Sequence, residues 1–190
     1  MKANTLHMRL LAGAALACMM TGAAFAEGGP VAEKPASVAS PDVTTERLAN
    51  ANQELAQGNW ITHHGNLWGQ RYSPLTQINK DTVKGLHVAW TMQLGGVEGG
   101  GIWTHGGLEG TPLAENGYLY VTDGWGSVYK IDTRGGKGTL MWKMDPKTDH
   151  DWAGAVACCG VDNRGAALYK NLVISHTLDG RIVATDKETG

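Results

Sequence analysis

The sequence has little aromatic variety and almost no excess charge. It contains one Phe among 190 residues, and its 16 basic and 18 acidic side chains leave a formal net charge of −2. A basic surface that could bind nucleic acid is therefore not expected. Zinc-type Cys and His arrays, phosphate-binding loops, Ser-His-Asp motifs and dinucleotide fingerprints are also missing. These absences argue against the common zinc-dependent and nucleotide-dependent classes of protein.

Glycine and tryptophan are plentiful instead. The chain has 27 Gly and 7 Trp, and its glycine share is about twice the usual value. Short runs of β-branched and aromatic residues alternate with Gly, Asn and Asp after Trp60. This composition favours turn-rich β structure over a helical bundle.

The first 26 residues have the pattern of an export signal. Lys2 and Arg9 precede an apolar run over residues 10–20, and a small-x-small site ends at Ala26. The apolar run is too short to span a membrane as a helix. We therefore expect a signal peptide over residues 1–26, cleaved after Ala26, and a membrane anchor is the alternative. Cys18 would be discarded with the signal.

Residues 27–58 are expected to form a flexible leader and a short helix. Three prolines fall between residues 27 and 43, a composition typical of unstructured segments. Asp42 can cap a helix that Gly58 ends. Apolar residues at i, i+3 and i+7 would share one helix face, namely Leu48, Ala51 and Leu55.

The segment from residue 59 to residue 190 contains an internal repeat. Predicted strands at 118–121 and 128–132 are followed by similar strands at 172–175 and 182–186. Asp132 and Asp186 occupy matching positions, and 186 − 132 = 54. Periods of this size are typical of β-propeller blades.

Tryptophan gives a second marker of the same repeat. Val88-Ala89-Trp90 and Leu140-Met141-Trp142 are each expected to end a strand, and 142 − 90 = 52. The next blade would begin with a strand over residues 111–114. A β-sandwich with two similar hairpins is the alternative. No third Trp-bearing strand follows the phrase that ends at Gly190, so we expect the chain to be a fragment of a longer protein.

Cys158 and Cys159 are the cysteines that follow the predicted signal. Adjacent cysteines can bond to each other in an eight-membered ring, which would be a rigid and fairly flat apolar surface. Such a ring could stack on a planar cofactor. Pairing of each cysteine elsewhere, or a reduced pair, remains open.

Two charged residues flank this pair in sequence. Arg164 lies in Asn163-Arg164-Gly165 and offers a planar fork for carboxylates. Glu109 precedes Gly110 at a predicted strand start, which would place its carboxylate at the mouth of a propeller. Ordinary solvated loop residues are the alternative for both side chains.

Together these segments resemble the pyrroloquinoline quinone (PQQ) dependent alcohol dehydrogenases, which include the methanol dehydrogenases. The likeness covers nearly all of residues 59–190. It rests most on Cys158-Cys159 followed by Asn163-Arg164-Gly165, and on the Trp-ended repeat. Further matching segments are Asn59-Trp60, Gln70-Arg71-Tyr72-Ser73-Pro74-Leu75, Glu109-Gly110-Thr111-Pro112-Leu113 and Thr177-Leu178-Asp179-Gly180-Arg181.

The resemblance implies an eight-bladed, all-β propeller with PQQ in its central cavity. A vicinal disulfide, here Cys158–Cys159, would stack on the cofactor, and Glu109 and Arg164 would make polar contacts to it. A Ca²⁺ or lanthanide ion would act as Lewis acid, and an aspartate would accept the alcohol proton. A periplasmic enzyme of this kind oxidises primary alcohols to aldehydes and passes electrons to a cytochrome c or a quinone. The sequence leaves a homodimer open.

Two positions depart from the family pattern. Gly160 stands where Asp is usual and Asp162 where Val is usual. Asp162 could orient Arg164 or compete with the cofactor for it. The metal ligands and the catalytic aspartate are expected beyond Gly190, so no catalytic or metal-binding residue is assigned in this chain, and the fragment alone is expected to be inactive. The alternatives are a non-catalytic exported propeller scaffold for envelope protein assembly and a related sugar dehydrogenase.

Overall fold

The structure is a computed structural model that describes residues 39–100 and 102–190. The predicted signal peptide, its cleavage site after Ala26 and most of the leader lie outside the described residues. The described part belongs to one unit, Pro35–Gly190. None of its helices is long and apolar enough to cross a membrane.

The predicted short helix exists but is broken into two pieces. α1 covers Thr45–Ala49 and α2 covers Ala51–Ala56. The prediction of Asp42 as the cap was wrong, because the extended residue Thr44 accepts the backbone N–H of Arg47 at 3.3 Å. The predicted apolar face is confirmed, since Ala51 and Leu55 are buried and Leu48 packs against the core.

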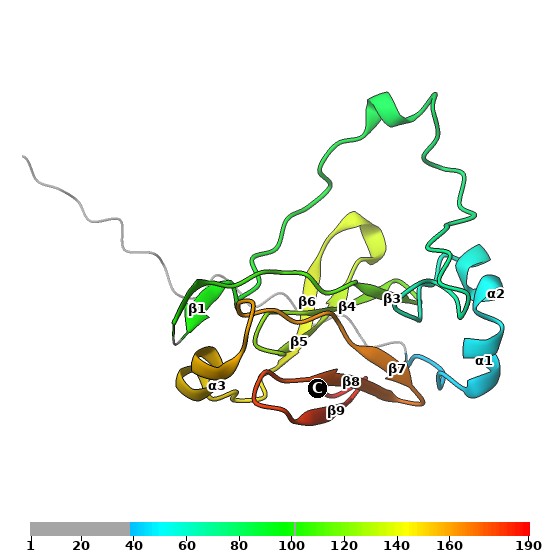
Figure 1. Cartoon of the computed structure of the whole chain (residues 1–190). Coiled ribbons are helices and arrows are strands. Elements are labelled where there is room, and N and C mark those ends of the chain that lie inside the picture. The colour runs from blue at the N-terminus through cyan, green and yellow to red at the C-terminus, as the bar shows by residue number, and fades with distance from the viewer. Residues whose placement is uncertain (1–38, 101) are drawn as a thin grey trace, which may run out of the picture. The chain divides into compact units, whose positions relative to one another are not determined.

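The first sheet is an antiparallel meander of four strands (Figure 1). Its strands are β3 (Leu113–Glu115), β4 (Tyr118–Thr122), β5 (Val128–Asp132) and β6 (Thr139–Met144). Asn116 and Gly117 both have positive φ, of 51° and 79°. Two such residues make the tight turn that joins hairpin strands with a matching twist. Local turn chemistry therefore fixes the pairing of β3 with β4.

The second sheet repeats the first. It contains β7 (Ala167–Tyr169), β8 (Leu172–His176) and β9 (Ile182–Asp186). Each of these strands begins at the same offset from its counterpart β3, β4 or β5, since 167 − 113, 172 − 118 and 182 − 128 are all 54. The repeat predicted from the sequence is confirmed strand by strand. The predicted strand at 111–114 begins slightly later, at Leu113.

Tryptophan rings lie against glycines of the following repeat. A Cβ added to Gly138 would meet the Trp90 ring at 2.4 Å, and one added to Gly190 would meet the Trp142 ring at 2.8 Å. The two pairs have the same spacing in sequence, since 138 − 90 and 190 − 142 are both 48. Trp142 also donates its indole N–H to the carbonyl of Lys187 at 3.1 Å. Each ring thus needs a glycine beneath it, which explains the paired Gly and Trp spacing.

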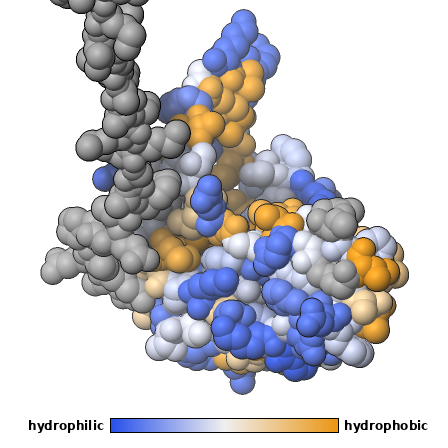
Figure 2. All heavy atoms as spheres, turned by 90° about the vertical axis from the view of Figure 1, so that its left-hand side faces the viewer, coloured by the Kyte–Doolittle hydropathy of each residue, from blue (hydrophilic) through white to orange (hydrophobic). Residues whose placement is uncertain are grey.

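The strand predicted to end at Trp90 is not formed. Residues 86–94 have no regular secondary structure, because no strand among the described residues pairs with them. They belong to a segment over residues 67–94 that loops away from the sheets and contains the short 3₁₀ helix η1 (Val83–Gly85) (Figure 1). Figure 2 shows apolar side chains below its hydrophilic tip, in keeping with the exposure of Ile78, Leu86 and Val88.

The core lies between the two sheets. Its buried side chains come from β3 to β8 and from the segment before the first sheet, and include Val43, Ile61, Leu113, Tyr118, Tyr120, Val128, Met141, Trp142, Leu168 and Val173. Tyr120 and Val128 of the first sheet and Val173 of the second are at most 1% exposed. The two repeats therefore share one apolar interior, as neighbouring propeller blades do.

Ion pairs join the N-terminal helices to one end of the sheets. Lys187 Nζ lies 2.7 Å from Glu115 Oε2, and both side chains are fully buried. Arg47 contacts the other oxygen of Glu115 and also Glu54, each at 2.7 Å. We call these four residues, Arg47, Glu54, Glu115 and Lys187, the clasp.

Other elements were not predicted from the sequence. β1 (Glu98–Gly100) and β2 (Trp103–His105) form a small hairpin, and α3 (His150–Val156) lies beside β1 (Figure 1). Asp149 caps α3 by accepting the N–H of Trp152 at 2.9 Å. A second 3₁₀ turn, η2 (Arg134–Gly136), joins β5 to β6.

Candidate cofactor site

Two segments run side by side and bring the predicted site residues together. Residues 106–111 lie parallel to residues 161–165, with bridges between Gly106 and Val161 and between Thr111 and Gly165. Gly107 donates its N–H to the carbonyl of Val161 at 3.1 Å. This pairing places Glu109 beside Arg164, although the two residues are far apart in the sequence.

Glu109 and Arg164 form an ion pair. The Arg164 side chain is 68% exposed and that of Glu109 is 43% exposed. An ion pair this exposed contributes little to stability. Both groups therefore keep donor and acceptor capacity for a ligand at the surface.

Cys158 and Cys159 stand directly before the paired segment. Their sulfur atoms are bonded to each other. Cys158 and Cys159 are both exposed, whereas Gly160 and Val161, which follow them, are buried. The disulfide therefore presents a surface to solvent close to Arg164 in the chain.

Asn163 fixes the backbone next to Arg164. Its side chain is only 2% exposed. The amide oxygen accepts the N–H of Gly165 at 2.8 Å, and the amide nitrogen donates to the carbonyl of His176 at 2.8 Å. A buried amide satisfied on both sides rigidifies its loop. The sequence showed Asn163 as a turn residue, and the buried bond to His176 could not be read from it.

Two glycines allow the backbone of this site to pack closely. A Cβ added to Gly124 would be 2.5 Å from the carbonyl oxygen of Val161, and one added to Gly110 would be 2.6 Å from Thr122 Oγ1. Real Cβ atoms do not approach so closely. Only glycine fits at either position, so the loop that follows the disulfide sits directly on the turn after β4.

Asp162 does not pair with Arg164. Among the described ion pairs, Arg164 is held by Glu109, and Asp162 takes part in none. A Cβ added to Gly107 or Gly160 would be 3.1 or 3.3 Å from an Asp162 oxygen. The carboxylate thus faces the two glycines. Within the described residues, Glu109 is the side chain that orients Arg164.

The described residues contain no group of three or more His, Cys, Asp or Glu side chains suited to a metal ion. The disulfide, Glu109 and Arg164 stay the predicted cofactor-binding residues.

Comparison with known proteins decides the family. The model of the PQQ family, described as the β-propeller domain of glucose, ethanol and alcohol dehydrogenases, matches residues 60–190. The chain belongs to this family. The β-propeller predicted from the internal repeat is thereby confirmed, and the described sheets are part of such a propeller.

Individual relatives agree with this assignment. A quinohemoprotein alcohol dehydrogenase of Comamonas testosteroni is 38% identical over 92% of this chain and 22% of that protein. The 1-butanol dehydrogenase (cytochrome c) of Thauera butanivorans is 40% identical over 71% of this chain and 18% of that protein. The chain thus spans about a fifth of the length of these relatives.

Solved structures show the same likeness. A quinohemoprotein alcohol dehydrogenase of Pseudomonas putida superposes with a TM-score of 0.70, at 38% identity, over 80% of this chain and 20% of that one. A europium-containing methanol dehydrogenase gives a TM-score of 0.65 at 33% identity, over 77% and 24%.

Proposed function

We propose that this chain is the N-terminal part of an exported PQQ-dependent alcohol dehydrogenase that oxidises primary alcohols to aldehydes. The observation that carries the proposal is the exposed disulfide Cys158–Cys159, which shortly precedes Arg164 in the chain, together with the Glu109–Arg164 pair, in a chain whose relatives are named alcohol dehydrogenases. A scaffold propeller has no need for such a surface.

The donor set fits PQQ. PQQ is a flat aromatic quinone that carries carboxylate groups, and when bound it supplies the two-electron acceptor for alcohol oxidation. We assign the disulfide as the platform under its ring and the Arg164 guanidinium as the partner of a carboxylate. Glu109 would hold that guanidinium in place and contact the cofactor from the same side.

The metal and the base belong to the proposal as well. A europium-containing methanol dehydrogenase is among the structural relatives, which supports a lanthanide or Ca²⁺ site. No described residues of this chain form such a site, so we place its ligands and the catalytic aspartate in the remainder of the full-length protein. The names of the relatives support a cytochrome c or a quinone as electron acceptor.

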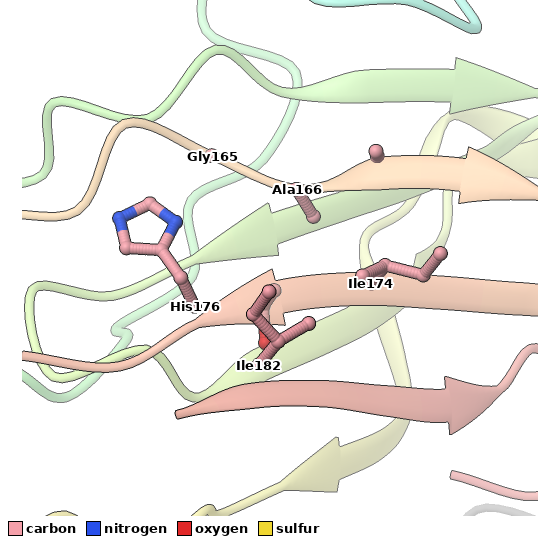
Figure 3. A pocket seen from close by; sticks show the side chains of 7 residues that line it. Gly165, Ala166, Ile174, His176 and Ile182 are labelled. Atoms are coloured by element: carbon pink, nitrogen blue, oxygen red, sulfur yellow. The ribbon is translucent and has the colours of Figure 1, made fainter. Parts of the chain in front are cut away.

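An open face on the second sheet supports further blades. A hollow of about 270 Å³ lies over Gly165, Ala166, Ile174, His176 and Ile182 (Figure 3). Ile174 and Ile182 occupy the positions in β8 and β9 that Tyr120 and Val128 occupy in β4 and β5, and the latter two are buried in the core that the sheets share. We propose that a third blade covers the hollow in the full-length protein, within a ring of eight.

Export to the periplasm is the remaining part of the proposal. It rests on the predicted signal over residues 1–26 and on an oxidising compartment for the disulfide. Detection of the mature N-terminus at Glu27 in a periplasmic fraction would support it. A cytosolic protein that keeps Met1 would contradict it.

The function can be tested on the full-length protein. Apo-protein is mixed with PQQ and either Ca²⁺ or La³⁺, and dye reduction is followed with primary alcohols of increasing chain length. We expect alcohol-dependent dye reduction and bound quinone absorbance. Failure with both metals, without quinone binding, would favour the scaffold. The isolated chain of residues 1–190 serves as the matched control, and we expect it to oxidise no alcohol.

A further inference from the structure

The backbone on either side of the disulfide is held by the β1–β2 hairpin and the residues that follow it. Trp103 of β2 donates its indole N–H to the carbonyl of Ala157 at 2.8 Å. Gly107 donates its backbone N–H to the carbonyl of Val161 at 3.1 Å. Ala157 and Val161 flank the Cys158–Gly160 stretch. Hydrogen bonds from the hairpin and from the residues after it therefore reach both ends of the loop that carries the disulfide.

The loop has few other attachments. Among the described residues, the backbone groups of Cys158, Cys159 and Gly160 make no hydrogen bond to the protein. The position of the disulfide therefore depends on its two flanks. The C-terminal flank is fixed by backbone pairing with Gly106 and Gly107. At the N-terminal flank, Ala157 donates its own N–H to the carbonyl of Ala153 in α3 at 2.9 Å, and its carbonyl is linked to the hairpin by one side chain, Trp103.

The indole is itself well anchored. Trp103 packs against a buried cluster of Trp125, Ala153 and Val161, which are at most 3% exposed. This cluster joins α3, the segment after the disulfide and the turn after β4. Because the cluster holds the ring in place, its N–H can restrain the position of the Ala157 carbonyl through one directional hydrogen bond.

We propose that Trp103 is a positioning residue that sets the cysteine platform for the cofactor. The inference rests on the proposed PQQ function but concerns a residue outside the predicted cofactor contacts. Packing alone would be satisfied by another aromatic ring. What the tryptophan adds is the N–H, so the proposal predicts a specific effect of losing that donor.

The same cluster supplies a matched control. Trp125 is 3% exposed, and its indole N–H has no hydrogen-bond partner among the described residues. Replacing Trp103 or Trp125 by Phe removes one indole from the same apolar cluster in each case. Only Trp103→Phe removes a hydrogen bond to the loop that carries the disulfide.

The test uses the full-length protein without cofactor and then with PQQ. Hydrogen exchange is measured on peptides that cover residues 157–165, and the Kd for PQQ is measured by titration of the apo-protein. For Trp103→Phe we expect faster hydrogen exchange in the loop and a Kd for PQQ that is about three- to tenfold higher. A factor of this size corresponds to the net free energy that one hydrogen bond typically contributes. For Trp125→Phe we expect the exchange rate of the loop and the Kd for PQQ to stay within about twofold of the wild-type values.

A second variant keeps the shape of the ring. β-(3-benzothienyl)alanine at position 103 retains two fused rings but has no N–H, so it separates the hydrogen bond from packing if Trp103→Phe folds poorly. Unchanged exchange and unchanged Kd in this variant would overturn the proposal. Equal losses in the Trp103 and Trp125 variants would also overturn it, since they would indicate packing alone.

The two hypotheses fail in different ways. A wild-type protein that binds no PQQ rejects the proposed function, whereas the hydrogen-exchange comparison still decides whether Trp103 holds the loop. Faster exchange with unchanged PQQ affinity would show that Trp103 holds the loop without serving the cofactor, and would overturn the positioning role.

Discussion

The two sheets carry a glutamate–cation pair at each end, one buried in the interior and the other exposed to solvent. At the clasp, the side chains of Glu115 and Lys187 are fully buried. At the other end of the same segment, the side chains of Glu109 and Arg164 are 43% and 68% exposed. The two glutamates are close in sequence, since Glu109 shortly precedes β3 and Glu115 ends it.

The difference indicates a division of labour. Buried charges at the clasp must stay paired, because an unpaired charge in the interior is costly. The end that carries the cysteines is held instead by backbone hydrogen bonds, close glycine contacts and the buried Asn163. Its charged side chains are therefore free to exchange partners with a ligand.

The largest expected effect is on stability at the clasp. Glu115→Ala leaves Lys187 and Arg47 without their shared partner, and we expect it to lower the free energy of unfolding by about 3–5 kcal/mol. The matched control is Glu109→Ala at the exposed pair, for which we expect less than about 1 kcal/mol. Urea unfolding of the apo-protein measures both variants, and equal losses would contradict the comparison.

At the exposed pair, the expected effect is on the affinity for the cofactor and not on stability. Arg164→Ala removes a charge-assisted hydrogen bond to a PQQ carboxylate, and we expect the Kd for PQQ to rise by about 10- to 100-fold. The unfolding midpoint should hardly move, because the side chain is exposed. Arg164→Lys keeps the charge and should lose less. Wild-type affinity in Arg164→Ala would remove Arg164 from the site.

A glycine tests how the loop that carries the cysteines is held. Gly124→Ala would place a Cβ 2.5 Å from the carbonyl of Val161, and we expect a loss of about 1–3 kcal/mol from overpacking. Gly85→Ala is the control, since its Cβ would meet nothing within 4 Å. Circular dichroism melts would compare the two variants, and an unperturbed Gly124→Ala protein would show that the close approach is not needed.

The smallest effect is a pH dependence at the clasp. The hydrogen bond from Arg47 lowers the pKa of Glu54 below its ordinary value of 4.5. Because the folded pKa is the lower one, this contribution is complete above the unfolded pKa and is lost as the pH falls through the folded value. Glu54→Gln should flatten the acid branch of the stability curve by less than about 1 kcal/mol. An unchanged acid branch would indicate that Glu54 contributes nothing there.

The sequence predicted the repeating strands because their signals are local. Alternating apolar residues and tight turns recur at the interval that separates Asp132 from Asp186, and the structure has β3, β4 and β5 again as β7, β8 and β9. The prediction of a strand ending at Trp90 was wrong, because a strand also needs a neighbouring strand to pair with. Local sequence signals do not show whether such a neighbour exists.

Contacts between distant segments were out of reach. Glu109 and Arg164 were both predicted as site residues, but not as partners of each other. Trp103 contacts Ala157, which is distant in sequence, and no local pattern marks that bond. The burial of Lys187 was equally hidden, because lysine is almost always exposed. Propensity and spacing therefore predicted the strands, and the family resemblance predicted the site residues, while the hydrogen bonds around the site required the structure.

The platform role of the disulfide is the central claim, and titration of the full-length apo-protein with PQQ tests it most directly. Wild type is compared with the double variant Cys158→Ser, Cys159→Ser. We predict saturable binding by wild type and a Kd at least about tenfold higher in the variant, equivalent to about 1.4 kcal/mol, with a similar unfolding midpoint. Equal affinity of the two proteins for PQQ would contradict the account.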